Sequence, residues 1–140
     1  MSETIFDAFA KPPCAELLGW RLIAIDRENQ SIRIGFTARP EFLNPSGFVQ
    51  GGLLAAMLDD VMGPAALVMS EGRLFTSTLD MTVSYLAPAR LGPLIGEGRV
   101  IQLGKTIGYL QGELHDETGT LIARATSTAR LVPTTALSAQ

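Results

Sequence analysis

One long apolar segment, Gly51 to about Ser70, constrains the fold more than any other feature of the chain. Its apolar residues recur at helical spacing (i, i+4, i+7, i+11) and form one stripe, which neighbouring residues widen: Leu54, Leu58, Val61, Ala65, Leu53, Met57 and Val68. A helix that is apolar nearly all round has to be buried. We therefore expect one central helix, which Pro64 should kink, or loosen after Asp60, because proline removes a backbone donor.

Most of the remaining chain has the composition and alternation of β-strands. Two expected strands precede the helix and four follow it: Trp20–Ile25, Ser31–Phe36, Phe75–Leu86, Leu94–Leu103, Thr106–His115 and Leu121–Val132. The first two form a hairpin across the polar turn 26–30. Short helical turns over Glu3–Leu18 are broken by Pro12 and Pro13, and the tail Pro133–Gln140 is expected to be disordered. The order predicts an α+β fold in which an antiparallel sheet wraps one helix.

The size and composition of the chain limit its organisation. Its 140 residues fit one domain over 1–140, with a core at about 20–132. Hydrophobic residues make up 46% and charged residues only 18%, so part of the apolar surface is expected to lie against a partner subunit.

Charge and cysteine content exclude several classes of function. A net charge of -3 without any Lys/Arg cluster argues against nucleic-acid binding, which needs basic residues. The single cysteine, Cys14, forms no internal disulfide and belongs to no zinc-ligand spacing, which favours a cytoplasmic protein without a metal. The N-terminus lacks the apolar core of a signal peptide. Because Asp59 and Asp60 interrupt the longest apolar run, no segment is expected to span a membrane.

Residues 44–60, NPSGFVQGGLLAAMLDD, carry the candidate chemistry. Gly51 and Gly52 open the helix, where the first backbone N–H groups lack intrahelical partners and favour negative charge. Such donors suit a carbonyl that becomes an oxyanion, although paired glycines are also common as a tight entry turn. An aspartate on an apolar helix needs a function or a partner. Asp59 therefore serves either chemistry or an ordinary surface contact, and Asp60 is interpreted as structural.

This segment resembles the signature of the hotdog-fold acyl-CoA thioesterases, in particular the phenylacetate-degradation branch. That branch has an Asn, a spacer, His-Gly-Gly and an acidic residue further along the helix. Residues 79–89, LDMTVSYLAPA, resemble the strand that follows the helix in the same branch. The resemblance extends from about Trp20 to Val132. It implies a hotdog fold, a curved sheet around one helix, and hydrolysis of an acyl-CoA thioester.

The resemblance assigns a role to each candidate residue. Gly51 provides the backbone N–H that polarises the thioester carbonyl, and the Asp59 carboxylate acts as general base or as nucleophile, with the base favoured. Asn44 matches an amide near the thioester or water, although an Asn before a proline is also a common turn former. Substrate-binding roles fall to Gln50, Gly52 and Thr78, whose hydroxyl would help to position water.

Gln50 departs from the pattern, because the branch usually has histidine at this position. Glutamine forms hydrogen bonds but does not titrate. This difference leaves a non-catalytic acyl-CoA-binding protein as the alternative to an enzyme, and a dimeric structural scaffold as a third class. With His115 as the only histidine, a Ser-His-Asp triad is excluded.

The resemblance also implies partners. It places the site at a homodimer interface, with Asp59 and Gly51 from different subunits, and makes tetramers common. No metal or cofactor is required, since CoA is part of the substrate. Aromatic or medium-chain acyl groups are suggested, and acyl carriers other than CoA remain open.

Overall fold

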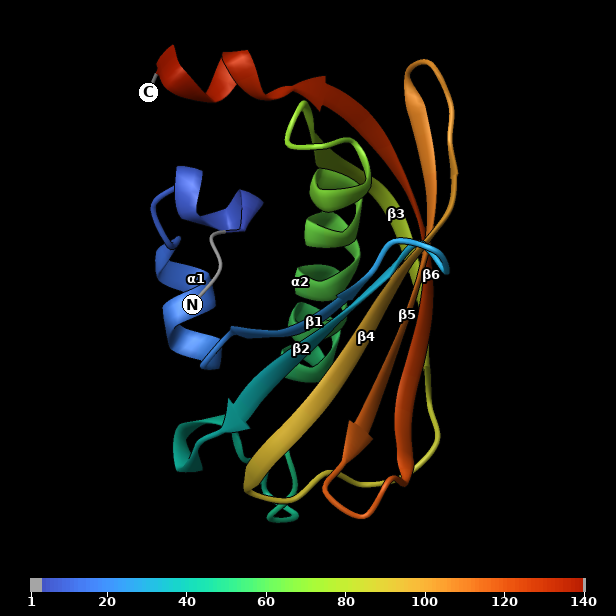
Figure 1. The fold of residues 1–140 in the computed structure, drawn as a ribbon. Helices are drawn as coiled ribbons and strands as arrows, with labels where there is room; N and C mark the ends of the chain where they lie inside the picture. The colour runs from blue at the N-terminus through green and yellow to red at the C-terminus, as the bar shows by residue number, and fades with distance from the viewer. Residues whose placement is uncertain (1–3, 140) are drawn as a thin grey trace.

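The protein is one six-stranded antiparallel sheet curved around one long helix, as the computed structural model of residues 4–139 shows (Figure 1). The strands are β1 (Arg21–Asp26), β2 (Ser31–Ala38), β3 (Leu74–Tyr85), β4 (Gly92–Leu103), β5 (Ile107–Asp116) and β6 (Leu121–Pro133). Their order across the sheet is β1-β2-β4-β5-β6-β3, so β1 and β3 form the two edges. The long helix is α2 (Gly51–Met69). The predicted arrangement of sheet and helix is confirmed.

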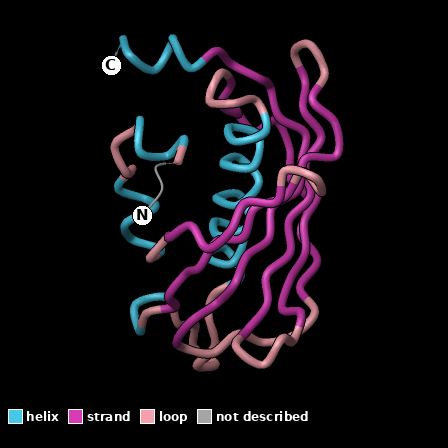
Figure 2. The backbone as a smooth tube through the Cα atoms, viewed as in Figure 1, coloured by secondary structure: helices cyan, strands magenta, loops and turns pink. Residues whose placement is uncertain are grey.

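The short helices lie outside this sheet (Figure 2). They are η1 (Ile5–Ala8), α1 (Pro13–Leu18), η2 (Pro40–Phe42) and η3 (Thr134–Ala139). Figure 1 shows α2 between the sheet and the N-terminal helices. Every strand boundary lies within two residues of its predicted position, because alternation of apolar and polar residues marks a strand directly.

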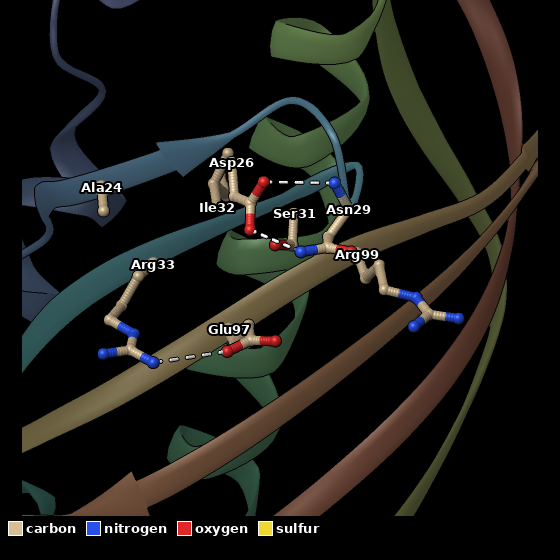
Figure 3. Close-up of a pocket in the computed structure, with 8 residues that line it drawn as sticks. All are labelled: Ala24, Asp26, Asn29, Ser31, Ile32, Arg33, Glu97 and Arg99. Atoms are coloured by element: carbon tan, nitrogen blue, oxygen red, sulfur yellow. Dashed lines mark hydrogen bonds and ion pairs between the residues drawn. The ribbon is translucent and has the colours of Figure 1, made fainter.

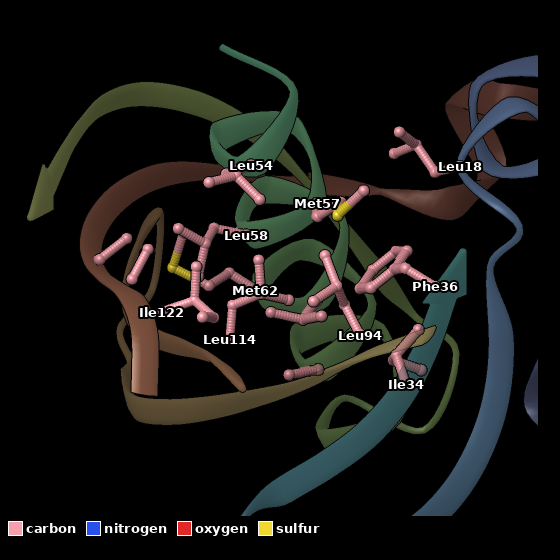
Figure 4. Close-up of a cluster of buried hydrophobic side chains, with 14 of the residues drawn as sticks. Leu18, Ile34, Phe36, Leu54, Met57, Leu58, Met62, Leu94, Leu114 and Ile122 are labelled. Atoms are coloured by element: carbon pink, nitrogen blue, oxygen red, sulfur yellow. The ribbon is translucent and has the colours of Figure 1, made fainter. Parts of the chain in front are cut away.

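The core lies between α2 and the concave face of the sheet. All four residues of the predicted helical stripe are buried, and they pack with sheet residues such as Phe36, Leu94 and Leu114 (Figure 4). Gly98 on β4 allows the close approach, because a Cβ at this position would overlap the backbone carbonyl of Val61. The sheet thus holds α2 by both side-chain packing and glycine contacts.

α2 continues as one helix through Pro64, so the loosening after Asp60, one of the two expected effects of this proline, does not occur. Proline has no N–H, which leaves the carbonyl four residues earlier, on Asp60, without its helical donor. The indole Nε1 of Trp20 donates to that carbonyl oxygen at 2.9 Å. A tertiary hydrogen bond therefore replaces the missing helical one.

The tail is ordered where it was predicted to be disordered. β6 extends to Pro133 and η3 continues to Ala139, while Gln140 lies outside the described residues. The Thr134 hydroxyl donates to the carbonyl of Gly72 at 2.8 Å, and the Thr134 N–H donates to that of Arg73 at 2.9 Å. These bonds join the start of the tail to the turn after α2.

That no segment spans a membrane stays a prediction, because the test of length and hydropathy concerns composition alone. α2 meets both requirements, because two aspartates do not lower its hydropathy enough. Its apolar stripe packs against the sheet, so the same composition serves a core helix.

Candidate active site

The first turn of α2 presents two free backbone donors. Gly51 and Gly52 are its first two residues, and Gln50 precedes them as N-cap with no capping bond from its side chain. The Gln50 carbonyl accepts from the N–H groups of Leu53 and Leu54. Within residues 4–139, the N–H groups of Gly51 and Gly52 have no acceptor. They are available to an anionic or carbonyl oxygen.

Asn44 shapes the loop before α2. Its side-chain Oδ1 accepts from the N–H groups of Ser46 at 2.9 Å and Phe48 at 3.2 Å, and its own N–H donates to the Phe48 carbonyl at 2.7 Å. These bonds show Asn44 as a turn former, one of the two roles that the sequence allowed. The side-chain nitrogen of Asn44 has no hydrogen bond in the described part of the chain, so it remains available as a donor.

Asp59 and Thr78, both named from the sequence, lie together. Thr78 on β3 donates its hydroxyl to Oδ1 of Asp59 at 2.9 Å. Asp59 is exposed, and its Oδ2 has no partner among the described residues. The register of β3 against β6 shifts at Leu79, a bulge next to Thr78. One carboxylate oxygen is thereby oriented, and the other stays open as a proton acceptor.

Asp60 sits on another side of α2 from Asp59 and is half-buried. Its Oδ2 is buried without a hydrogen bond in the described chain. Burial, and secondarily the charge of Asp59, raise the pKa of Asp60 to about 7. The sequence gave no indication that the pKa of Asp60 is raised, because burial depends on the tertiary fold.

Tyr85 was not predicted as a site residue. Its hydroxyl donates to the backbone carbonyl of Gly51 at 2.7 Å. The two residues are 34 positions apart, and the only signal in the sequence was that Tyr85 lies inside the second stretch of family resemblance.

Gly51 and Asp59 do not meet within one chain. They lie on one continuous helix, about 12 Å apart along its axis at roughly 1.5 Å per residue. A thioester carbonyl and its attacking water need groups within about 3 Å of each. One α2 therefore does not bring both groups to a single thioester.

Two hollows of the surface lie elsewhere. One of about 310 Å³ is lined by residues of the β1–β2 hairpin and β4, where Arg33 pairs with Glu97 and Asp26 bonds Asn29 (Figure 3). Another lies beside Met69 and Ile101. Neither contains a predicted site residue. In the described part of the chain, no three His, Cys, Asp or Glu side chains gather as metal ligands.

Comparison with known proteins identifies the family. The profile of the Thioesterase superfamily matches residues 46–123, which include α2 and β3. This chain belongs to the Thioesterase superfamily. Human acyl-coenzyme A thioesterase 13 is 33% identical over 93 residues, covering 65% of this chain and 66% of the human protein. The chain thus matches just under two thirds of that relative's length.

Solved structures show the same fold. A phenylacetic acid degradation-related protein of Ralstonia eutropha JMP134 is 37% identical, with a TM-score of 0.83 over 90% of this chain and 95% of that one. The PaaI protein of E. coli, from the phenylacetic acid degradation operon, is 21% identical with a TM-score of 0.78 over 86% and 85% of the two chains. The hotdog fold and the resemblance to the phenylacetate-degradation branch are both confirmed.

Proposed function

We propose that the protein is an acyl-CoA thioesterase whose site combines Gly51 of one subunit with Asp59 of another. One observation carries this proposal: the same helix has both an exposed carboxylate, Asp59, held by Thr78, and free N–H groups at its start. A carboxylate and an oxyanion donor are the two groups that thioester hydrolysis needs. Membership of the family and the likeness to acyl-coenzyme A thioesterase 13 support the same chemistry.

In the proposed reaction, the Gly51 N–H donates to the thioester oxygen and Asp59 takes a proton from water. The water oxygen attacks the carbonyl carbon, the C–S bond breaks, and the proton held by Asp59 passes to the departing CoA thiolate. The products are a free acid and CoA. Thr78 fixes the carboxylate, Asn44 offers its free amide nitrogen, and Gln50 and Gly52 border the approach to Gly51.

Attack by Asp59 itself would instead form an anhydride. A single turnover in isotopically labelled water separates the two routes. The general-base route puts the label into the acid product alone, whereas hydrolysis of an anhydride at the aspartyl carbon puts it into Asp59.

Two features support a homodimer. The first is the distance of about 12 Å between Gly51 and Asp59 along one helix, which a second subunit can close. The second is the edge strand β3, whose twelve residues are paired on one side only and are followed by exposed Leu86. Leu79 and Tyr85 of β3 are also more than half exposed. Such an edge invites pairing with another strand.

The alternative is a non-catalytic acyl-CoA-binding protein, and the observation behind it is Gln50 in place of histidine. Its exposed side chain makes no capping bond and has no titratable group. Thiol release from a panel of aryl- and aliphatic-CoA thioesters distinguishes the two functions. We expect turnover by the wild type and its collapse in Asp59→Ala. Tight binding without turnover of any thioester would favour the binding protein.

A further inference from the structure

Tyr85 contacts Gly51 in two ways. It is the last residue of β3, and its hydroxyl donates to the Gly51 carbonyl oxygen at 2.7 Å. Its ring lies against the same residue, because a Cβ built on Gly51 would come within 3.1 Å of the ring carbon Cζ. A hydrogen bond and a packing contact together fix the first residue of α2.

The hydrogen-bonded carbonyl is coupled to a free donor. The carbonyl of Gly51 and the N–H of Gly52 belong to one planar peptide unit. A hydrogen bond accepted by the carbonyl oxygen polarises the unit and makes its N–H a stronger donor. That N–H has no acceptor in the described part of the chain. Helix ends fray and glycine is conformationally permissive, so an external contact restricts the orientations of this peptide.

The same strand also orients the carboxylate. Thr78 of β3 bonds Asp59 at 2.9 Å, and Tyr85, seven residues further along, bonds Gly51. β3 therefore holds both chemically important positions of α2. Because preorganised donors stabilise a developing oxyanion without reorganisation during the reaction, holding the first turn of α2 bears directly on rate.

We propose that Tyr85 is a positioning residue for thioester hydrolysis. Its hydroxyl and ring hold the Gly51–Gly52 peptide so that the free N–H groups of the first turn face the thioester oxygen. This proposal rests on the proposed function, since that function places the thioester oxygen at the Gly51 N–H, beside the Gly52 N–H.

The test compares Tyr85→Phe with Tyr109→Phe. Phenylalanine keeps the ring and removes only the hydroxyl. The chain has two tyrosines, and Tyr109 is an exposed residue of β5 whose hydroxyl has no hydrogen bond in the described chain, so it is a matched control. In Tyr85→Phe we expect kcat to fall about tenfold, KM to change less than about twofold, and the melting temperature to stay unchanged. Tyr109→Phe should leave all three unchanged.

A second readout does not depend on turnover. The amide NMR resonances of Gly51 and Gly52 should shift, and their hydrogen exchange should accelerate, in Tyr85→Phe but not in Tyr109→Phe. Wild-type kcat in Tyr85→Phe, unchanged glycine amides, or a loss of kcat matched by a loss of melting temperature would each overturn the role of Tyr85. If the wild type releases no thiol, the proposed function fails and the role in hydrolysis fails with it. The amide resonances then show whether Tyr85 fixes the peptide at all.

Discussion

The hydroxyl of Thr78 lies 2.9 Å from Oδ1 of Asp59 and donates to it. This contact joins the edge strand to the middle of the central helix and leaves the second oxygen of the carboxylate open. For the general base that we propose, orientation affects the rate, because proton transfer requires hydrogen-bond distance.

Thr78→Val should lower kcat about tenfold, because a hydrogen bond to a charged group contributes roughly 1.5 kcal/mol or more. Thr78→Ser should retain activity. The matched control is Thr128→Val, since Thr128 of β6 donates to Asp80 of β3 at 2.6 Å, in another Thr–Asp pair that does not involve α2. Equal losses in the two valine variants would mean that the Thr78 bond has no special part in turnover.

The oxyanion donor is tested by Gly51→Pro. Proline suits the first position of a helix, and Gln50 already has the extended backbone (φ -62°, ψ 140°) that precedes proline well. The substitution removes the N–H, and we expect kcat to fall by about 10²–10³. Gly51→Ala adds the same Cβ against Tyr85 but keeps the N–H, so it should lose far less. Similar losses in both variants would assign the effect to steric crowding.

Asp60 should make stability depend on pH. Its pKa rises from 3.8 to about 7 on folding, so below about pH 4 the group is protonated in both states and has no effect. Between about pH 4 and 7 the unfolded chain releases this proton and the folded chain keeps it, which destabilises the fold progressively. The full shift corresponds to about 4 kcal/mol, and because the side chain is only half-buried we expect about 1–2 kcal/mol.

Asp60→Asn removes this titration. Urea unfolding at fixed protein concentration should show the variant more stable than wild type at pH 8 and similar to it near pH 4. Asp59→Asn should move the midpoint of the pH dependence downward, because the charge of Asp59 is the second cause of the shift. A wild type whose stability is no lower at pH 8, relative to Asp60→Asn, would contradict the buried carboxyl.

Trp20→Phe should destabilise the fold by about 1–3 kcal/mol, since it leaves the Asp60 carbonyl without a donor. Adding Pro64→Ala restores a helical N–H for that carbonyl. The double variant should therefore recover part of the loss, which a double-mutant cycle measures by thermal or urea unfolding. Strictly additive effects would show that the indole contributes only by packing.

Much of the fold was predictable from local patterns. Strand alternation and the helical stripe mark β1 to β6 and α2 directly, because burial acts on side chains at fixed spacing. The expected loosening at Pro64 and the expected disorder of the tail were wrong for one reason: distant groups, Trp20 and Gly72, provide the hydrogen bonds. Local sequence contains no information about such partners.

The site divides in the same way. The family resemblance identified Gly51, Asp59 and Thr78, and the structure brings the last two together. Tyr85 and the perturbed Asp60 depend on contacts and burial that only the folded chain reveals. The roles that the resemblance implies for Gly51 and Asp59 stay predictions, whereas the contacts of Tyr85 and the burial of Asp60 needed the structure.

A site shared between two subunits is tested most directly by complementation between Asp59→Asn and Gly51→Pro. Each variant alone should be nearly inactive against acyl-CoA thioesters. Co-expressed with different tags, half of the dimers should be mixed and each should contain one intact site, which gives about a quarter of wild-type activity. Mixed dimers that stay inactive beside an active wild type would contradict a site shared between subunits, and an inactive wild type would contradict thioester hydrolysis itself.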